Sequence, residues 1–306
     1  MIEKLNFDNS VKIGYISAVI AAALFGSIST IAKPALVTVT PLVLSFAVYL
    51  LAALAVTPLK KKSRISEIKR KDWLLILAMS ITGTVIAPVL FFSGLAQSKA
   101  SDTSVLSNAE IIFTILLAIV FFREKLKPIG YLSIALVIVG VIIITNNLEF
   151  STSLLDIKSE GNLLILAAMV FWGLDNNISK IASQRIDIPR LIQLKSAIGG
   201  SCLFAIVLLL GMPINITLAE VPNIILLGVV GFGISLIFFL NSLKRIGTVR
   251  TMVIYSTSAI FGLFLASIFL HESIGVYQVV AITMMLVGIF LIERQDKYVA
   301  AKQINH

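Results

Sequence analysis

The stretch LFGSISTIAK at residues 24–33 returns as FWGLDNNISK at residues 171–180. A second stretch, FTILLAIVFFRE at residues 113–124, returns as FGLFLASIFLHE at residues 261–272. The chain is therefore built from two copies of one half. Internal duplication in an apolar, helical chain is how many secondary transporters are built.

The composition places both copies in a membrane. Of the 306 residues, 58% are hydrophobic and 13% are charged, and the mean hydropathy is +1.00. A soluble chain carries about 25% charged residues. The apolar runs are about as long as a bilayer core requires, and a lone strand cannot satisfy its backbone in lipid. We therefore predict an all-α membrane protein with ten transmembrane helices, near residues 13–33, 36–57, 73–96, 102–122, 128–146, 161–183, 188–211, 221–243, 248–270 and 274–293.

The number of spans in each half determines how the halves are oriented. Five is an odd number, so the second copy must enter the membrane from the side opposite to the first. The sequence thus predicts two inverted five-helix repeats, residues 1–147 and residues 148–306, around a central cavity.

The basic residues indicate which side faces the cytoplasm. The formal net charge is +9, and all but three of the 25 Lys and Arg residues lie in the terminal tails or near alternate loops. The exceptions are Lys33, Lys99 and Lys158. By the positive-inside rule, this asymmetry predicts an integral protein of the cell (plasma) membrane with both termini in the cytoplasm. Topology explains the charge, and we expect no nucleic-acid partner.

Several kinds of site are not expected. The sequence has no Walker sequence, no dinucleotide glycine fingerprint and no cluster of metal ligands, and its two His residues are His271 and His306. We therefore expect no cofactor, no metal, no catalytic residue and no ATP-driven step in this chain. The lone Cys202 lies in the seventh span and is expected to be a small buried hydrophobe.

Polar residues within spans need a reason, and here they gather on the sixth span. Trp172, Asp175 and Ser179 share one helical face, and Asn176 and Lys180 form a neighbouring column. Asp175 lies well inside the span. Two interpretations are open for it: binding a substrate amine or carrying a proton in a cavity, or making a structural hydrogen bond or ion pair.

The corresponding first span ends in Lys33, the repeat mate of Lys180. Either lysine can bind a substrate or extend its ammonium group to the membrane surface. Lys195, one turn into the seventh span, has the same two interpretations, and we favour extension to the surface.

The fourth and ninth spans carry the second polar group. Ser107 and Glu110 lie on one face of the fourth span, and their counterparts in the second half are Tyr255 and Ser258. Glu110 can be a proton carrier, a substrate ligand or a helix cap. Since the two halves present unequal polar groups, together they suit an asymmetric ligand.

Other positions are expected to be structural. Pro88 removes a backbone donor and should kink the third span. The glycines of the eighth span permit close helix contact or a hinge. Two acidic residues at equivalent helix ends are expected to be caps or tethers to a neighbouring loop. These positions are Gly228, Gly231, Gly233, Glu124 and Glu272.

The duplicated aromatic-Gly…Lys stretch, the sequence NAEIIFTILLA at residues 108–118 with the REKL that follows, and its second copy resemble the EamA-type family of the drug/metabolite transporter superfamily. The resemblance covers roughly residues 14–293. It implies ten helices in two inverted five-helix repeats, a central cavity, and alternating access without ATP. It also implies that helices one, three, four, six, eight and nine line the path.

The sequence departs from the family pattern at three places. Ser45 stands where the family often has Arg early in helix two, while Lys195 holds the equivalent place in helix seven. Glu110 is followed by Ile111 rather than by proline. The family rarely has an acid at the position of Asp175, which makes this residue the best candidate for a feature particular to this protein.

We therefore predict a secondary transporter, an exporter of a small polar or amphipathic metabolite such as an amino acid. Protons coupled through Asp175 or Glu110, and facilitated exchange, are both open. The alternatives are a membrane-embedded enzyme acting on a lipid-like substrate, a carrier of sugar phosphates or nucleotide sugars, and a scaffold or sensor. The expected partners are a small-molecule substrate and the lipid bilayer; the oligomeric state is left open. The predicted substrate-binding residues are Asp175, Asn176, Trp172, Glu110, Ser107, Tyr255, Ser258, Lys180 and Lys33.

Overall fold

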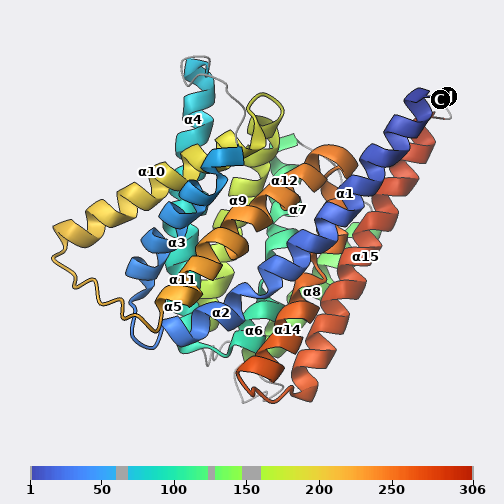
Figure 1. The fold of residues 1–306 in the computed structure, drawn as a ribbon. Helices are drawn as coiled ribbons and strands as arrows, with labels where there is room; N and C mark the ends of the chain where they lie inside the picture. Colours follow the sequence, from blue (N-terminus) through green and yellow to red (C-terminus); the bar gives the residue numbers. More distant parts are fainter. Residues whose placement is uncertain (1, 60–67, 123–127, 147–159, 305–306) are drawn as a thin grey trace.

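A computed structural model describes residues 2–59, 68–122, 128–146 and 160–304 (Figure 1). Within these ranges the regular structure is helical and no strand occurs, which confirms the all-α prediction. By length and composition, six helical segments of the described chain can cross a membrane: Ser10–Ala35, Pro41–Leu59, Arg70–Gln97, Ile188–Leu209, Val221–Ile246 and Arg250–Phe269. Two shorter apolar helices are Pro128–Ile144 and Val276–Leu291. A total of ten crossings stays a prediction.

The order of helices is similar in the two copies. The first copy contains α1 (Ile2–Gly26), α2 (Ile28–Ala35), α3 (Pro41–Val56), η1 (Thr57–Leu59), α4 (Arg70–Met79), η3 (Ser80–Ile86), α5 (Ala87–Gln97), α6 (Ala100–Leu106), α7 (Ala109–Phe122) and α8 (Pro128–Asn146). The second contains α9 (Glu160–Ser183), α10 (Ile188–Leu209), α11 (Val221–Leu226), η4 (Leu227–Ile234), α12 (Ser235–Ile246), α13 (Thr248–Tyr255), α14 (Ser258–Phe269) and α15 (Val276–Ile304).

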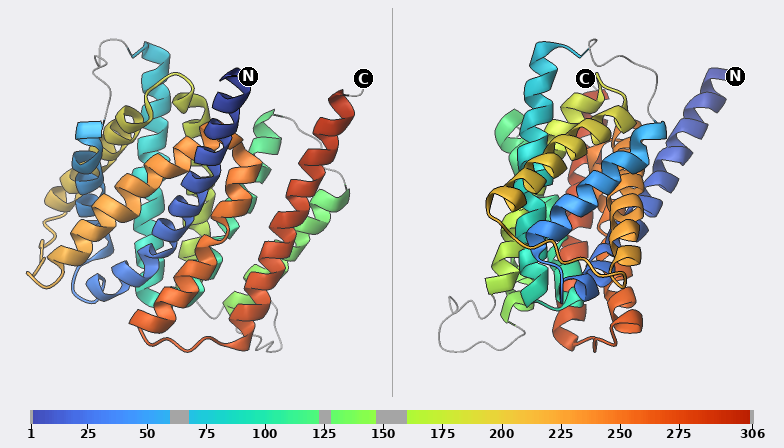
Figure 2. Two further views of the ribbon diagram at one scale, coloured as in Figure 1. Left: turned by 45° about the vertical axis from the view of Figure 1, so that its right-hand side comes forward. Right: turned by 60° about the vertical axis from the view of Figure 1, so that its left-hand side comes forward.

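The two copies interleave. Helix α3 packs against α10 and η4, α5 against α9, α1 against α12 and α14, and α15 against α8 (Figures 1 and 2). Each of these contacts joins one copy to the other. As a result, the buried apolar side chains form one continuous core that contains residues of both copies.

Basic residues gather at one end of the bundle. Helix α1 begins and α15 ends at the same end (Figures 1 and 2). At this end Arg245 Nη1 donates to Ser10 Oγ at 2.9 Å, and Arg185 Nη1 donates to Asp72 Oδ1 at 3.0 Å. These contacts bring the end of α12 to the start of α1, and the end of α9 to the start of α4. The described basic residues at this end include Lys12, Lys69, Arg70, Lys71 and Lys244.

Two π-helical segments occupy equivalent places in the copies. In η3 and η4 the helix widens to i→i+5 hydrogen bonds, a geometry that often occurs at functional sites. The Ala87 N–H bonds to the Thr82 carbonyl in this register, and Pro88 follows without an N–H of its own. Pro88 thus lies in the first turn of α5, directly after the π-helical segment, and the kink that it was expected to cause stays a prediction. Segment η4 contains three glycines and no proline.

Helix breaks also repeat. The chain turns at residues 107–108 between α6 and α7, and at residues 256–257 between α13 and α14. Hydroxyl groups compete with the backbone at both breaks: Ser107 Oγ donates to the Thr103 carbonyl at 2.8 Å, and Ser256 Oγ to the Val253 carbonyl at 2.6 Å. A further break at Ser27 separates α1 from α2, whereas α9 continues unbroken through the repeat position, Leu174.

Glycines allow the close helix crossings. A Cβ at Gly26 would lie 2.4 Å from the Ser258 carbonyl oxygen, and one at the repeat mate Gly173 would lie 2.9 Å from the Thr114 nitrogen. A Cβ at Gly228 would lie 2.5 Å from the Cβ of Leu51. The predicted close helix contact in the eighth span is thus confirmed for this glycine.

Two single-residue expectations have different outcomes. Glu272 is a tether, as predicted: its carboxylate accepts hydrogen bonds at 2.9 Å from the backbone N–H groups of Ala100 and Ser101 at the start of α6, where the helix dipole favours an anion. Its counterpart Glu124 lies outside the described residues. The expectation of a buried Cys202 is wrong, because this side chain is exposed on α10. It shares the outward face with Leu209, which is 85% exposed.

Candidate functional site

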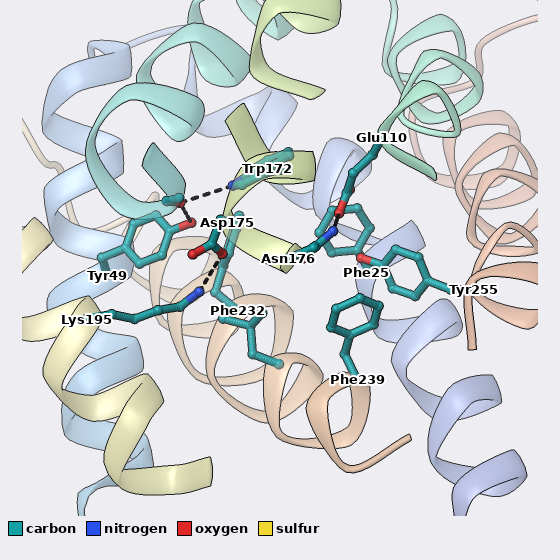
Figure 3. A pocket seen from close by; sticks show the side chains of 12 residues that line it. Phe25, Tyr49, Glu110, Trp172, Asp175, Asn176, Lys195, Phe232, Phe239 and Tyr255 are labelled. Carbon is teal, nitrogen blue, oxygen red and sulfur yellow. Dashed lines mark hydrogen bonds and ion pairs between the residues drawn. The ribbon is translucent and has the colours of Figure 1, made fainter. Parts of the chain in front are cut away.

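A small cavity at the centre of the bundle collects polar and aromatic side chains from both copies (Figure 3). Its volume is about 20 Å³, enough for about one water molecule. It is lined by Phe25, Tyr49, Gly83, Glu110, Trp172, Asp175, Asn176, Lys195, Phe232, Leu236, Phe239 and Tyr255. The cavity is therefore small, and most of the side chains that line it are buried.

A buried ion pair forms one side of the cavity. Lys195 Nζ lies 2.6 Å from Asp175 Oδ2, and the two side chains are 2% and 5% exposed. Our preference for a surface-directed Lys195 is therefore wrong. Helix α10 begins at Ile188, so the lysine lies about 10 Å along the helix. At this depth the ammonium group is stabilised by the Asp175 carboxylate and not by water.

The carbonyl of Gly83 is the junction of three helical segments. The hydroxyl of Tyr49 on α3 and the Nε1–H of Trp172 on α9 both donate to it at 3.0 Å. In the π-helical register its backbone donor would be residue 88, which is Pro88 and has no N–H. The proline thus leaves this carbonyl free to accept two side-chain donors.

The same glycine lets Asp175 approach. A Cβ at Gly83 would lie 2.3 Å from Asp175 Cγ, so no other residue fits this crossing without displacing the ion pair. The equivalent crossing in the other copy joins Gly231 to Ile28, and a Cβ there would lie 3.2 Å from Ile28 Cγ1. The crossing at Gly83 therefore contains a charged side chain, whereas the equivalent crossing at Gly231 is apolar.

Glu110 forms the other side of the cavity. Its Oε1 accepts a hydrogen bond of 2.6 Å from Asn176 Nδ2, which also lies 3.3 Å from Thr114 Oγ1. Its Oε2 is buried, and no described group donates a hydrogen bond to it. Figure 3 shows Glu110 pointing toward Asn176, with Phe25, Phe239 and Tyr255 on this side of the cavity.

Aromatic rings connect the two sides. The ring centroids of Phe25 and Tyr255 are 5.1 Å apart, and those of Phe239 and Tyr255 are 4.7 Å apart. Phe25 also meets Trp172 edge to face at 5.9 Å. Such distances are those of favourable aromatic pairs. The cavity wall is therefore mainly aromatic, with the charged groups set into it.

The structure brings together five of the nine predicted site residues: Asp175, Asn176, Trp172, Glu110 and Tyr255 line the cavity. The others lie away from its lining. Ser107 and Ser258 are buried beside the repeated helix breaks. Whether any of the nine binds substrate stays a prediction.

The two predicted lysines lie at helix ends. Lys33 Nζ donates to the carbonyls of Leu95 at 2.8 Å and Ser98 at 2.6 Å, which stabilises the end of α5. Lys180 is exposed in the last turn of α9. Neither lysine is among the residues that line the cavity.

Sequence reasoning did not include several lining residues in the site. Phe25 could have been predicted from the sequence, because it is the repeat mate of Trp172. Gly83 is signalled by the proline five positions later. Tyr49, Phe232 and Phe239 lie in uniformly apolar runs, where nothing in the local pattern distinguishes them from lipid-facing residues.

Comparisons with known proteins agree with this architecture. The pattern of the EamA-like transporter family matches residues 12–146 and again residues 159–294. A protein of Methanothermobacter thermautotrophicus named "Uncharacterized transporter" is 32% identical and covers 91% of this chain and 85% of its own length. A protein of the same name from Clostridium kluyveri is 27% identical and covers 70% of this chain and 68% of its own length.

A solved crystal structure shares the fold. It superposes with a TM-score of 0.64 over 98% of this chain and 99% of its own, at 13% sequence identity. This identity supports likeness of fold alone. The family pattern, in contrast, matches the chain twice, once in each copy of the internal repeat. Together the two matches cover nearly the whole chain. The chain belongs to the EamA-like transporter family.

Proposed function

We propose that this membrane transporter is a secondary exporter of a small polar or amphipathic metabolite, and that it works by alternating access without ATP. The observation that carries the proposal is the small central cavity, where charged side chains of both copies meet inside an apolar bundle. Ionisable residues at such depth are costly, and they usually mark a transport path. Binding sites at the interface of two repeats are the rule in secondary transporters.

The proposed topology has ten crossings in two inverted five-helix repeats. The repeated π-helices and helix breaks support it, because they occupy equivalent positions in the two copies. The end of the bundle that carries Lys69, Arg70, Lys71 and Lys244 is assigned to the cytoplasm by the positive-inside rule. Both termini would then be cytoplasmic.

The small cavity corresponds to an occluded state. A volume of about 20 Å³ holds no metabolite, so the surrounding helices must separate to admit one. The helix breaks and the π-helical segment η4 offer joints for this movement, since short irregular stretches absorb backbone rotation. Phe25 lies two residues before one break, and Tyr255 directly before another.

The arrangement of charges gives an anionic substrate little support. Lys195 is already paired with Asp175. Lys33 donates to backbone carbonyls, and Lys180 is exposed at the end of α9. Sugar phosphates and nucleotide sugars would therefore meet no unpaired cation among the residues that line the cavity.

The test is uptake by the purified protein in liposomes. The labelled panel contains amino acids, amines, organic acids and sugar phosphates, each with and without a pH gradient. We expect saturable uptake of one class, and a response to the gradient if protons are coupled. Protein-free liposomes and a Gly83→Ala variant, in which the crossing at the cavity is blocked, are the controls. If folded protein takes up no member of the panel, the proposal fails in favour of a lipid-like substrate.

A further inference from the structure

We propose that the Glu110 side of the central cavity binds the charged end of an organic cation: an ammonium group with apolar substituents and no carboxylate. The inference names the substrate class of the proposed transport site, and so it rests on the proposed function. It rests on the pairing of the charges in the cavity and on the aromatic rings beside Glu110.

The charges that line the cavity do not balance. Three side chains that can carry a charge line it, and two of them, Asp175 and Lys195, form an ion pair at 2.6 Å. The third is Glu110, whose Oε1 accepts one bond from an uncharged amide and whose Oε2 has no partner among the described residues. A buried carboxylate without a cation is costly. A positively charged ligand would supply the missing counter-charge.

The rings beside Glu110 favour the same ligand. Phe25, Phe239 and Tyr255 form consecutive aromatic pairs on this side (Figure 3). Ring faces carry negative potential, and they attract an ammonium group placed over them, most strongly where water is excluded. An anion would meet these faces and the Glu110 carboxylate together, so both would repel it.

Two other cation-bearing ligands fit less well. Ca²⁺ and Mg²⁺ take a shell of about six or more oxygen ligands, and the lining on this side offers only the oxygens of Glu110, Asn176 and Tyr255. A zwitterion needs a partner for its own carboxylate. The only lysine that lines the cavity is Lys195, and Asp175 already holds its ammonium group. The observations therefore favour an organic cation over an amino acid.

The test follows ligand binding through Trp172, which lines the cavity. The chain has two Trp residues, so Trp73→Phe makes Trp172 the sole tryptophan, which can be excited selectively over the tyrosines. Four probes share a benzyl group and differ in charge: benzyltrimethylammonium, its neutral carbon isostere neopentylbenzene, benzylsulfonate, and phenylalanine. We expect saturable quenching by the cation, and at least tenfold weaker binding of the other three.

Variants identify which groups are responsible. Glu110→Gln should weaken binding of the cation at least tenfold, whereas Glu110→Asp, which keeps the charge, should bind it more tightly than Glu110→Gln. Phe25→Leu and Phe239→Leu should each weaken it about 2- to 30-fold, the range of a cation–π contact. Phe204→Leu is the matched aromatic control: its ring pairs with Phe46 at 5.2 Å and does not line the cavity. It should leave the affinity unchanged.

Specific results would overturn the inference. They are equal affinity for benzyltrimethylammonium and neopentylbenzene, unchanged cation binding by folded Glu110→Gln, and no saturable binding of the cation by the Trp73→Phe protein. Failure of the two proposals is distinguishable. Saturable uptake of a zwitterion or an anion without cation binding would refute the substrate class and leave transport standing. Cation binding without uptake of any ligand would refute transport and leave the cation site standing.

Discussion

Removing one charge of the Asp175–Lys195 pair should destabilise the protein far more than removing both. The side chains are almost fully buried and their charged atoms are 2.6 Å apart. Asp175→Asn keeps the shape of the side chain but leaves the Lys195 ammonium without its counter-ion. Lys195→Met similarly strands the carboxylate. The double variant leaves neither charge in the cavity.

The expected magnitude follows from this geometry. At an effective dielectric constant of about 20, unit charges 2.6 Å apart attract by about 6 kcal/mol. Desolvation offsets part of this attraction, so each single substitution should lower the free energy of unfolding by about 3–5 kcal/mol. The double variant should lie within about 1–2 kcal/mol of the parent, because an apolar replacement of a buried pair is often close to neutral.

The assay is equilibrium unfolding in mixed micelles, with increasing dodecyl sulfate and circular dichroism as the signal. Arg185→Gln is the comparison variant, because Arg185 pairs with Asp72 at 3.0 Å and is 48% exposed, whereas Asp72 is 6% exposed. It should lower the free energy of unfolding less than either single variant of the central pair, because water solvates the guanidinium group of Arg185.

The cycle has a clear refuting result. If the double variant loses as much free energy of unfolding as the two single variants together, the two charges do not interact. If Asp175→Asn is as stable as the parent, Lys195 has another counter-charge or reaches water, and the argument from burial is wrong.

The remaining predictions concern a helix crossing and a loop. Gly83→Ala would place a Cβ 2.3 Å from Asp175 Cγ and should abolish uptake, whereas Gly231→Ala, whose Cβ would lie 3.2 Å from Ile28 Cγ1 and needs only a small shift of that side chain, should reduce it only mildly in the same assay. Hydrogen bonds from Thr217 and Thr38 lower the pKa of Glu220 from its usual 4.5. Because the folded pKa is depressed, the loop contact is present above the unfolded pKa and is lost as pH falls through the folded one. A spin label in this loop should become mobile in that pH window. Thr38→Ala should raise the pH midpoint of this change, because it removes one of the two hydrogen bonds. An unchanged midpoint would contradict the contact.

Much of the fold was predictable because each signal was local. Long apolar runs predicted helices, and the duplicated stretches predicted two copies with equivalent elements. Glu272 was recognisable as a tether because it recurs at a helix end. Cys202 was not placed correctly, because a uniformly apolar helix does not show which face meets lipid and which meets the core.

The site was predictable only where polarity interrupts an apolar run. Asp175, Asn176 and Glu110 stood out for this reason. Tyr49 and Phe239 did not, since their roles come from contacts between segments far apart in the chain. Lys195 shows a further limit: its charge was evident, but its direction depended on a partner on the neighbouring helix.

The Gly83 carbonyl constrains how the protein can divide into moving parts. It is held by Tyr49 from the first copy and by Trp172 from the second, and Pro88 deprives it of any backbone substitute. Separating α3 from α9 would break at least one of these two bonds and leave the Tyr49 hydroxyl or the Trp172 N–H without its acceptor in an apolar medium, where such groups are costly. Segments α3, η3 and α9 should therefore travel as one rigid body. Since α3 and η3 belong to the first copy and α9 to the second, each moving part would contain segments of both copies, and the two copies would not move as two separate bodies.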